Sequence, residues 1–205
     1  TEIYTLSLHD ALPICEKFGI EVKVIPVTDN TVSTRITTNK GKLHLQEYWV
    51  KYRGMDPVEG IEYEGIEKAR PNPEAISAIH DSELVIIAPG NPLTSIGPMM
   101  MMKGIKKELS KNKRKVVAVS PIIGNKAVSG PAGKYMEAAG IEVSAYGVAK
   151  WYAEVCSKLV IDTRDRIQTK KIESLNVSVY DTKIKMTNKK DEDALASFLL
   201  KQIRI

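Results

Sequence analysis

The chain has few of the residues that define several protein classes. Its 205 residues include only two cysteines, Cys15 and Cys156, which argues against a disulfide framework and favours a reducing, cytoplasmic setting. No apolar run approaches the roughly 20 residues that a membrane-spanning helix needs. The three histidines, His9, His44 and His80, share no ligand-like spacing with cysteines or acidic residues, which argues against a zinc site. Neither a P-loop nor a serine–histidine–acid set occurs.

The net charge is +5, and a basic protein raises the question of nucleic-acid binding. The basic residues gather along one predicted helix and the loop after it, and they are Lys103, Lys106, Lys107, Lys111, Lys113, Arg114 and Lys115. Such runs are typical of a solvated helix face. A mild positive field would also suit a phosphorylated small molecule. We therefore expect no nucleic-acid partner.

The first fourteen residues, TEIYTLSLHDALPI, do not fit the rest of the chain. They show no clear hydrophobic period, and they lack the basic start and apolar core of a signal peptide. They resemble the translation of an adapter used in short-read DNA sequencing. We predict that residues 1–14 are a non-native segment, and that residues 15–205 are the C-terminal portion of a single domain.

Hydrophobic periodicity predicts strands first and then an alternation of helices and strands. Strands are expected at Glu21–Val27, Leu84–Ala88, Lys115–Ser120, Lys158–Ile161 and Asn176–Tyr180, and around Gly60–Tyr63, with a hairpin of Ser33–Thr38 and Lys42–Val50. Helices are expected at Pro73–Ile79, Thr94–Leu109, Pro131–Ala139, Ala145–Val155 and Asp191–Arg204. Continuously apolar strands between amphipathic helices indicate an α/β fold. We predict a Rossmann-like, mostly parallel sheet with helices on both faces and an inserted antiparallel hairpin.

Ligands of an open parallel sheet bind beyond the carboxyl ends of its strands, and the loop after Leu84–Ala88 lies at such a place. Gly90 lets the backbone turn tightly or approach a ligand, and Asn91 supplies a polar side chain. Thr94 or Ser95 would cap the next helix, whose free N–H groups attract phosphate. An ordinary capped turn would look the same.

The loop after the next buried strand is also rich in glycine and polar residues. It contains Ser120, Gly124 and Asn125, and it leads through Ser129 and two further glycines to Lys134. Backbone donors with one lysine suit a phosphate or diphosphate. A long flexible loop is the plainer explanation, but two such loops on successive parallel strands favour a shared crevice.

Other candidates are less specific. Asp29 follows a predicted strand, and it would bind a metal ion, a ribose or only its own turn. The run Met99–Met102 is more typical of core packing than of a ligand surface. The charged residues of 162–166 follow the strand Lys158–Ile161, and they would form an ion-pair cluster at a helix start or the rim of the cleft.

At the two glycine-rich loops the sequence resembles the 2-phospho-L-lactate transferase family of coenzyme F-420 biosynthesis. The segments that carry the resemblance are PNPEAISAI (71–79), PGNPLTSIGP (89–98), VAVSPIIGN (117–125), SGPAGKYM (129–136), GIEVSAYGVAKW (140–151), PVTDNTVST (26–34) and QEYWV (46–50). The likeness runs from about residue 15 to the C-terminus. The combination of TSIGP and SPIIGN at this spacing is highly specific.

The resemblance implies a transferase, usually a homodimer assisted by Mg²⁺, that moves 2-phospho-L-lactate or its enolpyruvyl analogue from a GDP-linked donor to a deazaflavin, with release of GMP. It places the two loops near the nucleotide and the transferred phosphate. The nucleotide- or phosphate-binding candidates are Gly90, Asn91, Thr94, Ser95, Ser120, Gly124, Asn125 and Lys134. No catalytic residue is assigned.

Family members begin with a strand, a glycine-rich turn and an aspartate segment that holds metal and deazaflavin, and this chain lacks a match to them. We therefore expect the metal site to lie outside the 205 residues, and the chain alone to be inactive. The alternative is a nucleotide-sugar-binding regulatory protein of related fold. A generic nucleic-acid-binding α/β domain is a more distant possibility.

Overall fold

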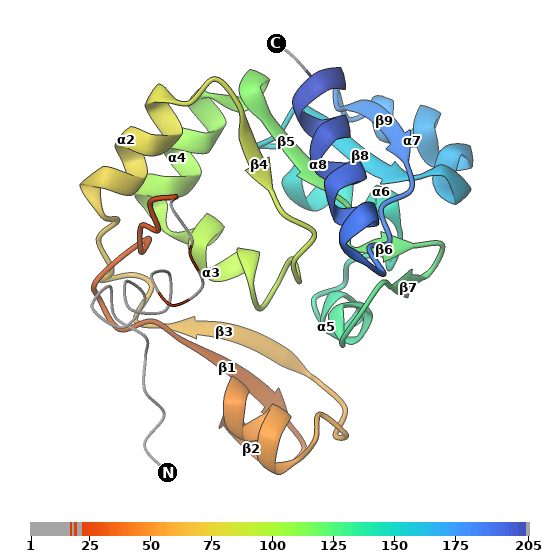
Figure 1. Ribbon diagram of the computed structural model, residues 1–205. Coiled ribbons are helices and arrows are strands. Elements are labelled where there is room, and N and C mark those ends of the chain that lie inside the picture. The colour runs from red at the N-terminus through yellow and green to blue at the C-terminus, as the bar shows by residue number, and fades with distance from the viewer. Residues whose placement is uncertain (1–16, 18, 20–21, 204–205) are drawn as a thin grey trace.

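The computed structural model describes residues 17, 19 and 22–203, so the predicted non-native segment lies outside the described residues. A four-stranded parallel sheet forms the centre of the molecule (Figure 1). Its order is β4-β5-β8-β9, with bounds β4 Val85–Ile87, β5 Val116–Val119, β8 Lys158–Asp162 and β9 Ser178–Thr182. The predicted parallel α/β sheet is thus confirmed.

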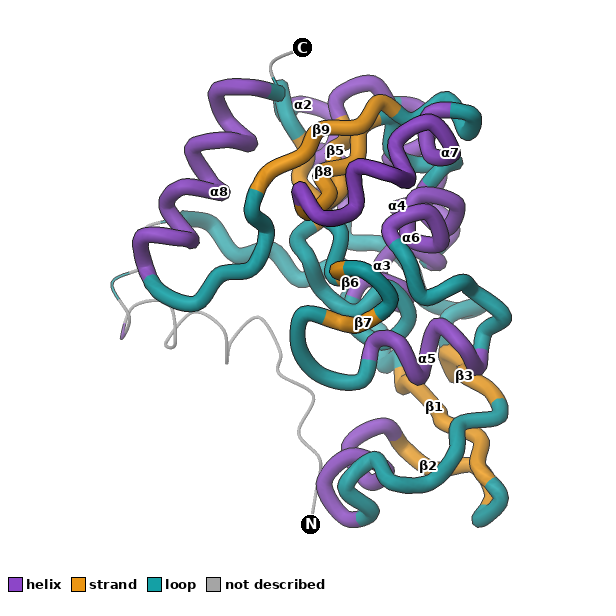
Figure 2. The backbone as a smooth tube through the Cα atoms, turned by 90° about the vertical axis from the view of Figure 1, so that its right-hand side faces the viewer, coloured by secondary structure: helices purple, strands orange, loops and turns teal. Residues whose placement is uncertain are grey.

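The central strands β5 and β8 are buried on both faces because their alternate residues enter two different cores. In β5, Val116 and Ala118 belong to the larger core, whereas Val117 and Val119 belong to a smaller one with Leu195 of α8 (Lys189–Gln202). Figure 2 shows α8 on one side of the strands and α4, α6 and α7 on the other. Two-sided burial explains why the strands read as continuous apolar runs.

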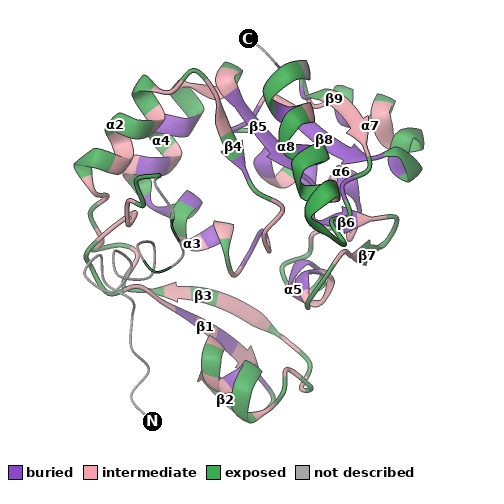
Figure 3. Cartoon of the chain, in the orientation of Figure 1, coloured by how far each residue is buried: buried purple, intermediate pink, exposed green. Residues whose placement is uncertain are grey.

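Helices α2, α6 and α8 begin where the sequence supplies a side-chain oxygen for the free N–H groups of the first turn. Asn72 accepts from Glu74 N, Ser144 from Gly147 N and Asn188 from Asp191 N. The bounds are α2 Pro73–Asp81, α3 Ile96–Met101, α4 Lys103–Lys111, α5 Ala132–Ala138, α6 Ala145–Tyr152, α7 Thr169–Glu173 and the 3-10 turns η2 Lys113–Lys115 and η3 Thr163–Gln168. The outer helix faces are exposed, whereas the two central strands of the parallel sheet, β5 and β8, are buried (Figure 3).

A second, antiparallel sheet has the order β2-β1-β3 and lies apart from the parallel strands, beyond α3 and α5 (Figure 1). Its strands are β1 Ser33–Thr38, β2 Gly41–His44 and β3 Gly60–Glu64, and a short π-helical segment, η1 (Glu47–Lys51), follows β2. A two-stranded hairpin, β6 Ile122–Ile123 and β7 Lys126–Ala127, follows β5. The inserted antiparallel hairpin is confirmed.

Three predicted elements differ from the structure. No strand forms over residues 22–27, where Val22 and Val24 are 71% and 38% exposed. The strand Lys42–Val50 ends at His44, because the helical segment that follows buries the Tyr48 ring completely while its hydroxyl donates to the carbonyls of Gly54 and Asp56. Tertiary packing thus overrides strand propensity there.

The helix predicted over Thr94–Leu109 is two helices. Met102 is extended between them (φ −64°, ψ 121°) and is buried, as is Met100. Gly104, near the start of α4, packs so closely on Pro71 that a Cβ there would lie 2.5 Å from the proline ring. Core packing is therefore confirmed for two of the four methionines, since Met99 and Met101 are exposed.

Candidate functional site

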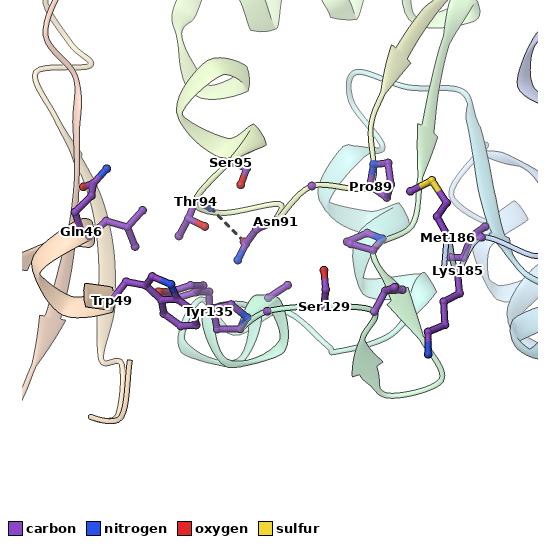
Figure 4. A pocket seen from close by; sticks show the side chains of 18 of the residues that line it. Gln46, Trp49, Pro89, Asn91, Thr94, Ser95, Ser129, Tyr135, Lys185 and Met186 are labelled. Carbon is purple, nitrogen blue, oxygen red and sulfur yellow. Dashed lines mark hydrogen bonds between the residues drawn. The ribbon is translucent and has the colours of Figure 1, made fainter. Parts of the chain in front are cut away.

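A cavity of about 630 Å³ opens between the carboxyl ends of β4 and β5 and the antiparallel sheet (Figure 4). Its size is typical of a small-molecule site, for which roughly 300–1,000 Å³ is usual. The lining residues come from four segments, and they are Leu45, Gln46, Trp49, Val50; Pro89, Gly90, Asn91, Thr94, Ser95; Pro121, Val128, Ser129, Gly130, Pro131, Ala132, Tyr135; and Ile184, Lys185, Met186. The position matches the rule for open parallel sheets.

The loop after β4 supplies four of the predicted residues to the cavity: Gly90, Asn91, Thr94 and Ser95. Its turn is closed by Asn91, whose Oδ1 accepts from Leu93 N at 3.0 Å and from Thr94 N at 3.2 Å (Figure 4). The predicted cap is wrong, because Ser95 stands at the N-cap of α3 without a side-chain cap hydrogen bond. Among the described residues, no hydrogen bond uses the hydroxyl of Thr94 or Ser95 or the Nδ2 of Asn91, so all three groups are available to a ligand.

Tyr63 of β3 holds the same loop from the antiparallel sheet. Its hydroxyl donates to Leu93 O at 2.5 Å. Burial raises the pKa of Tyr63 to about 12, so the phenol keeps its proton at ordinary pH. The two sheets are thus joined at the edge of the cavity.

The loop after β5 enters the cavity later than predicted, through Pro121 and residues 128–132. Ser120 is fully buried, and its hydroxyl is hydrogen-bonded to the N–H and carbonyl of Ile122. Gly124 donates its N–H to both carboxylate oxygens of Asp165, at 2.9 and 3.1 Å. Ser120, Gly124 and Asn125 are outside the lining of this cavity, and their assignment as ligand-binding residues stays a prediction.

Lys134 of α5 also lies outside this lining. Its ammonium donates to Gly54 O at 2.6 Å and to Met55 O at 3.3 Å, and it sits 5.6 Å from the centroid of the Tyr48 ring. These contacts join α5 to the segment after η1. The predicted phosphate contact of Lys134 is untested, but its ammonium already has partners.

Two of the four lining segments were not predicted to be part of a ligand-binding site. One is η1 with its approach, represented by Gln46 and Trp49; the other is Ile184–Met186, after β9. The second carried a usable signal, since β9 is a parallel strand and its carboxyl end shares the sheet edge with β4 and β5. The first carried only its part in the family resemblance, QEYWV (46–50), which assigned no site residue, because its helical turn follows from the burial of Tyr48.

The charge of the cavity favours an anion. Among its described lining residues Lys185 is the one cation, and none carries a carboxylate. Two buried carboxylates near the ends of the strands are used internally. Asp162 accepts from Arg164 and from Ile184 N, and Arg164 holds the pKa of that carboxyl below its usual range. Asp165 accepts from the backbone N–H of Gly124. The Asp162–Arg164 ion pair, with Asp162 at the N-cap of η3, confirms the ion-pair and helix-start interpretation of residues 162–166.

The described residues do not fit a resident Mg²⁺ ion. Within them, no group of three or more His, Cys, Asp or Glu side chains could hold a metal ion. Mg²⁺ binds through carboxylates and water in near-octahedral geometry, and the cavity lining offers no carboxylate. In the same residues, no helix is long and apolar enough to cross a membrane.

A parallel α/β sheet with a cavity beyond its strand ends is the arrangement of α/β proteins that bind small molecules. Sequence comparison gives the family. The profile described as 2-phospho-L-lactate transferase CofD matches residues 7–200, and the chain belongs to this family of transferases. The predicted resemblance is confirmed.

Individual relatives agree. The chain is 43% identical over 176 residues to the 2-phospho-L-lactate transferase of Methanococcoides burtonii. The matched region covers 86% of this chain and 56% of that protein. It is 44% identical over 189 residues to the enzyme of Methanosarcina mazei, a match that covers 91% of this chain and 62% of that protein. It is 49% identical over 158 residues to the enzyme of Methanocaldococcus jannaschii, a match that covers 75% of this chain and 50% of that protein. The chain therefore spans about half to three fifths of these relatives.

A solved structure shows the same fold. A crystal structure of a Bacillus halodurans protein matches with a TM-score of 0.62 at 12% identity, covering 94% of this chain and 66% of the other. A second Bacillus halodurans structure, described as a member of the UPF0052 family, matches with a TM-score of 0.55. At this identity the likeness concerns the fold alone.

Proposed function

We propose that the chain forms the ligand-binding part of an enzyme that moves 2-phospho-L-lactate, or its enolpyruvyl analogue, from a GDP-linked donor to the hydroxyl of the deazaflavin 7,8-didemethyl-8-hydroxy-5-deazariboflavin. The observation that carries this is the cavity in a chain of the 2-phospho-L-lactate transferase family, whose described lining includes the hydroxyls of Thr94, Ser95 and Ser129 and the ammonium of Lys185. The whole protein would act in coenzyme F-420 biosynthesis, in the cytoplasm and as a homodimer. Mg²⁺ assistance stays a prediction.

The reaction is a phosphoryl transfer with a hydroxyl nucleophile. The acceptor oxygen forms a new bond to the phosphorus of the phospholactyl group, the P–O bond to the GMP phosphate breaks, GMP leaves and the acceptor hydroxyl loses its proton. Catalysis of this kind rests on positioning and on neutralising charge. Asn91, Thr94, Ser95 and Ser129 would donate hydrogen bonds to the donor, and Lys185 would neutralise part of its negative charge.

Binding selectivity tests the proposal on the 205-residue chain. We expect saturable binding of GDP in calorimetric titration, with weaker binding of a UDP-sugar and of single-stranded RNA. Preference for the UDP-sugar would support the nucleotide-sugar-binding regulator instead. Because the chain spans only part of its relatives, we expect no transfer product from it alone; deazaflavin phospholactate in its mass spectrum would contradict that expectation.

A single hydroxyl provides a sharper test. Ser95→Ala should weaken GDP binding about 2- to 10-fold, the usual effect of one hydrogen bond. Ser77→Ala is the matched control, because Ser77 is also an exposed serine, lies in α2 and is outside the cavity lining. Equal affinities of the two variants would argue against the cavity as the nucleotide site.

A further inference from the structure

Trp49 presents an exposed indole to the cavity. It lies in η1, opposite the Asn91–Ser95 loop, and it is 47% exposed (Figure 4). Its neighbour Val50 is 75% exposed and also lines the cavity. The wall formed by η1 is therefore aromatic and apolar, whereas the facing loop carries the amide and the hydroxyls. Large apolar side chains gathered at an open cavity mark a binding surface.

The indole rests against a turn that only glycine fits. Gly54 has φ +61°, and a Cβ there would lie 2.7 Å from Cζ3 of Trp49. Tyr48, buried at the base of η1, donates its hydroxyl to Gly54 O at 2.9 Å and to Asp56 O at 2.7 Å. The ring is thus supported before any ligand arrives, and a preorganised side chain loses less entropy on binding.

Lys134 of α5 also holds this turn. Its ammonium donates to the carbonyls of Gly54 and Met55 and lies over the Tyr48 ring. Lys134 belongs to α5, the helix that carries the cavity residue Tyr135. The contact sets the position of the Trp49 support relative to the glycine-rich loops.

We propose that Trp49 stacks on a planar heteroaromatic ring of the ligand in this cavity, and that Lys134 is a positioning residue that holds the turn supporting Trp49. The identity of the ligand rests on the proposed function. Two rings in the proposed substrates have this planar heteroaromatic character: the deazaflavin ring of the acceptor and the guanine of the donor. Both are flat and present π-faces to an indole.

Calorimetric titrations of the 205-residue chain with the deazaflavin and with GDP distinguish the sources. Trp49→Ala should weaken the stacked ligand about tenfold or more and leave the other unchanged, since aromatic stacking contributes about 1–3 kcal/mol per ring. Trp49→Phe should retain most of the affinity. Ile167→Ala is the control, because Ile167 is also a large apolar side chain, 92% exposed, and lies outside this cavity.

Lys134→Ala should lower the affinity for the same ligand that Trp49→Ala affects, by about 3- to 10-fold. In the Trp49→Ala background it should lower the affinity little further, as a double-mutant cycle of coupled residues requires. Lys134→Arg should restore part of the loss. A Lys134→Ala variant that loses affinity for inorganic diphosphate, with deazaflavin binding intact, would show a phosphate ligand and overturn the positioning role.

The remaining outcomes are also decisive. If folded Trp49→Ala and Trp49→Phe bind both ligands like the unaltered chain, the stacking inference is wrong while the proposed function stands. If Trp49→Ala instead changes self-association in analytical ultracentrifugation, Trp49 is a contact between copies. If the unaltered chain binds neither ligand, both the proposed function and the stacking inference are wrong.

Discussion

At the scale of single residues, the side-chain amide of Asn91 has two separate functions in this account: its oxygen stabilises the loop, and its nitrogen is expected to contact the ligand. Its Oδ1 closes the loop on Leu93 N and Thr94 N, while its Nδ2 stays available at the cavity. Asn91→Asp keeps the acceptor but adds a negative charge beside an anionic ligand. We expect an unchanged melting temperature and GDP binding about tenfold weaker.

Asn91→Ala should show a different pattern. It removes the acceptor of two backbone N–H groups, so we expect a loss of about 1 kcal/mol in the free energy of unfolding. Urea denaturation of both variants measures the difference. Asn91→Asp that binds GDP as well as the unaltered chain would mean that no anion binds near this loop.

At the scale of elements, α3 packs on the antiparallel sheet through Gly97. A Cβ there would overlap the Tyr63 hydroxyl and lie 2.9 Å from Pro92 O. We expect Gly97→Ala to destabilise the chain by about 1–3 kcal/mol, the usual cost of overpacking. Gly60→Ala in β3 is the control, since its nearest contact is an ordinary 3.6 Å to Thr37. Similar unfolding midpoints for both variants would contradict the close packing.

The start of α8 depends on Asp191, which accepts from Lys183 and Thr187. The Lys183 hydrogen bond, followed by those from Thr187, lowers the pKa of Asp191 from 3.8 to about 2. A lowered pKa stabilises the fold above the unfolded value, and this stability is lost as pH falls from about 4 to about 2.

Asp191→Asn should therefore lower the melting temperature at pH 7 and flatten its decline between about pH 4 and 2. Differential scanning calorimetry over that range checks the prediction. Asp193→Asn is the control, because its carboxylate lies on the same helix, 63% exposed, and pairs only with Lys189 among the described residues. A parallel decline in both variants would contradict the assigned function of Asp191.

The sequence predicted most elements because their signals are local. Buried strands such as β5 are apolar throughout, and α2 begins at an asparagine cap followed by a proline. The segment after β2 could not be predicted, because its helical turn depends on tertiary packing that buries Tyr48, with its hydroxyl on the carbonyls of Gly54 and Asp56. For the same reason Trp49 was missed as a site residue, while Gly90–Ser95 followed directly from a strand end.

At the scale of the whole molecule, the chain has a net charge of +5, but the basic side chains among the described residues form no evident nucleic-acid-binding surface. Several basic side chains are paired, including Lys106 with Glu154 and Lys111 with Glu108. We expect any binding of duplex DNA to disappear at about 150 mM salt and not to compete with GDP, because it is a non-specific phosphate contact. Salt-resistant binding in fluorescence anisotropy would contradict this.

The central claim is that the cavity between the two sheets binds the nucleotide donor. A crystal structure of the chain grown with GDP tests it most directly. We predict a diphosphate against Gly90–Ser95 and Ser129, with Lys185 nearby and the β4 and β5 strand ends beneath it. GDP bound elsewhere, with this cavity filled only by solvent, would contradict the assignment of the site.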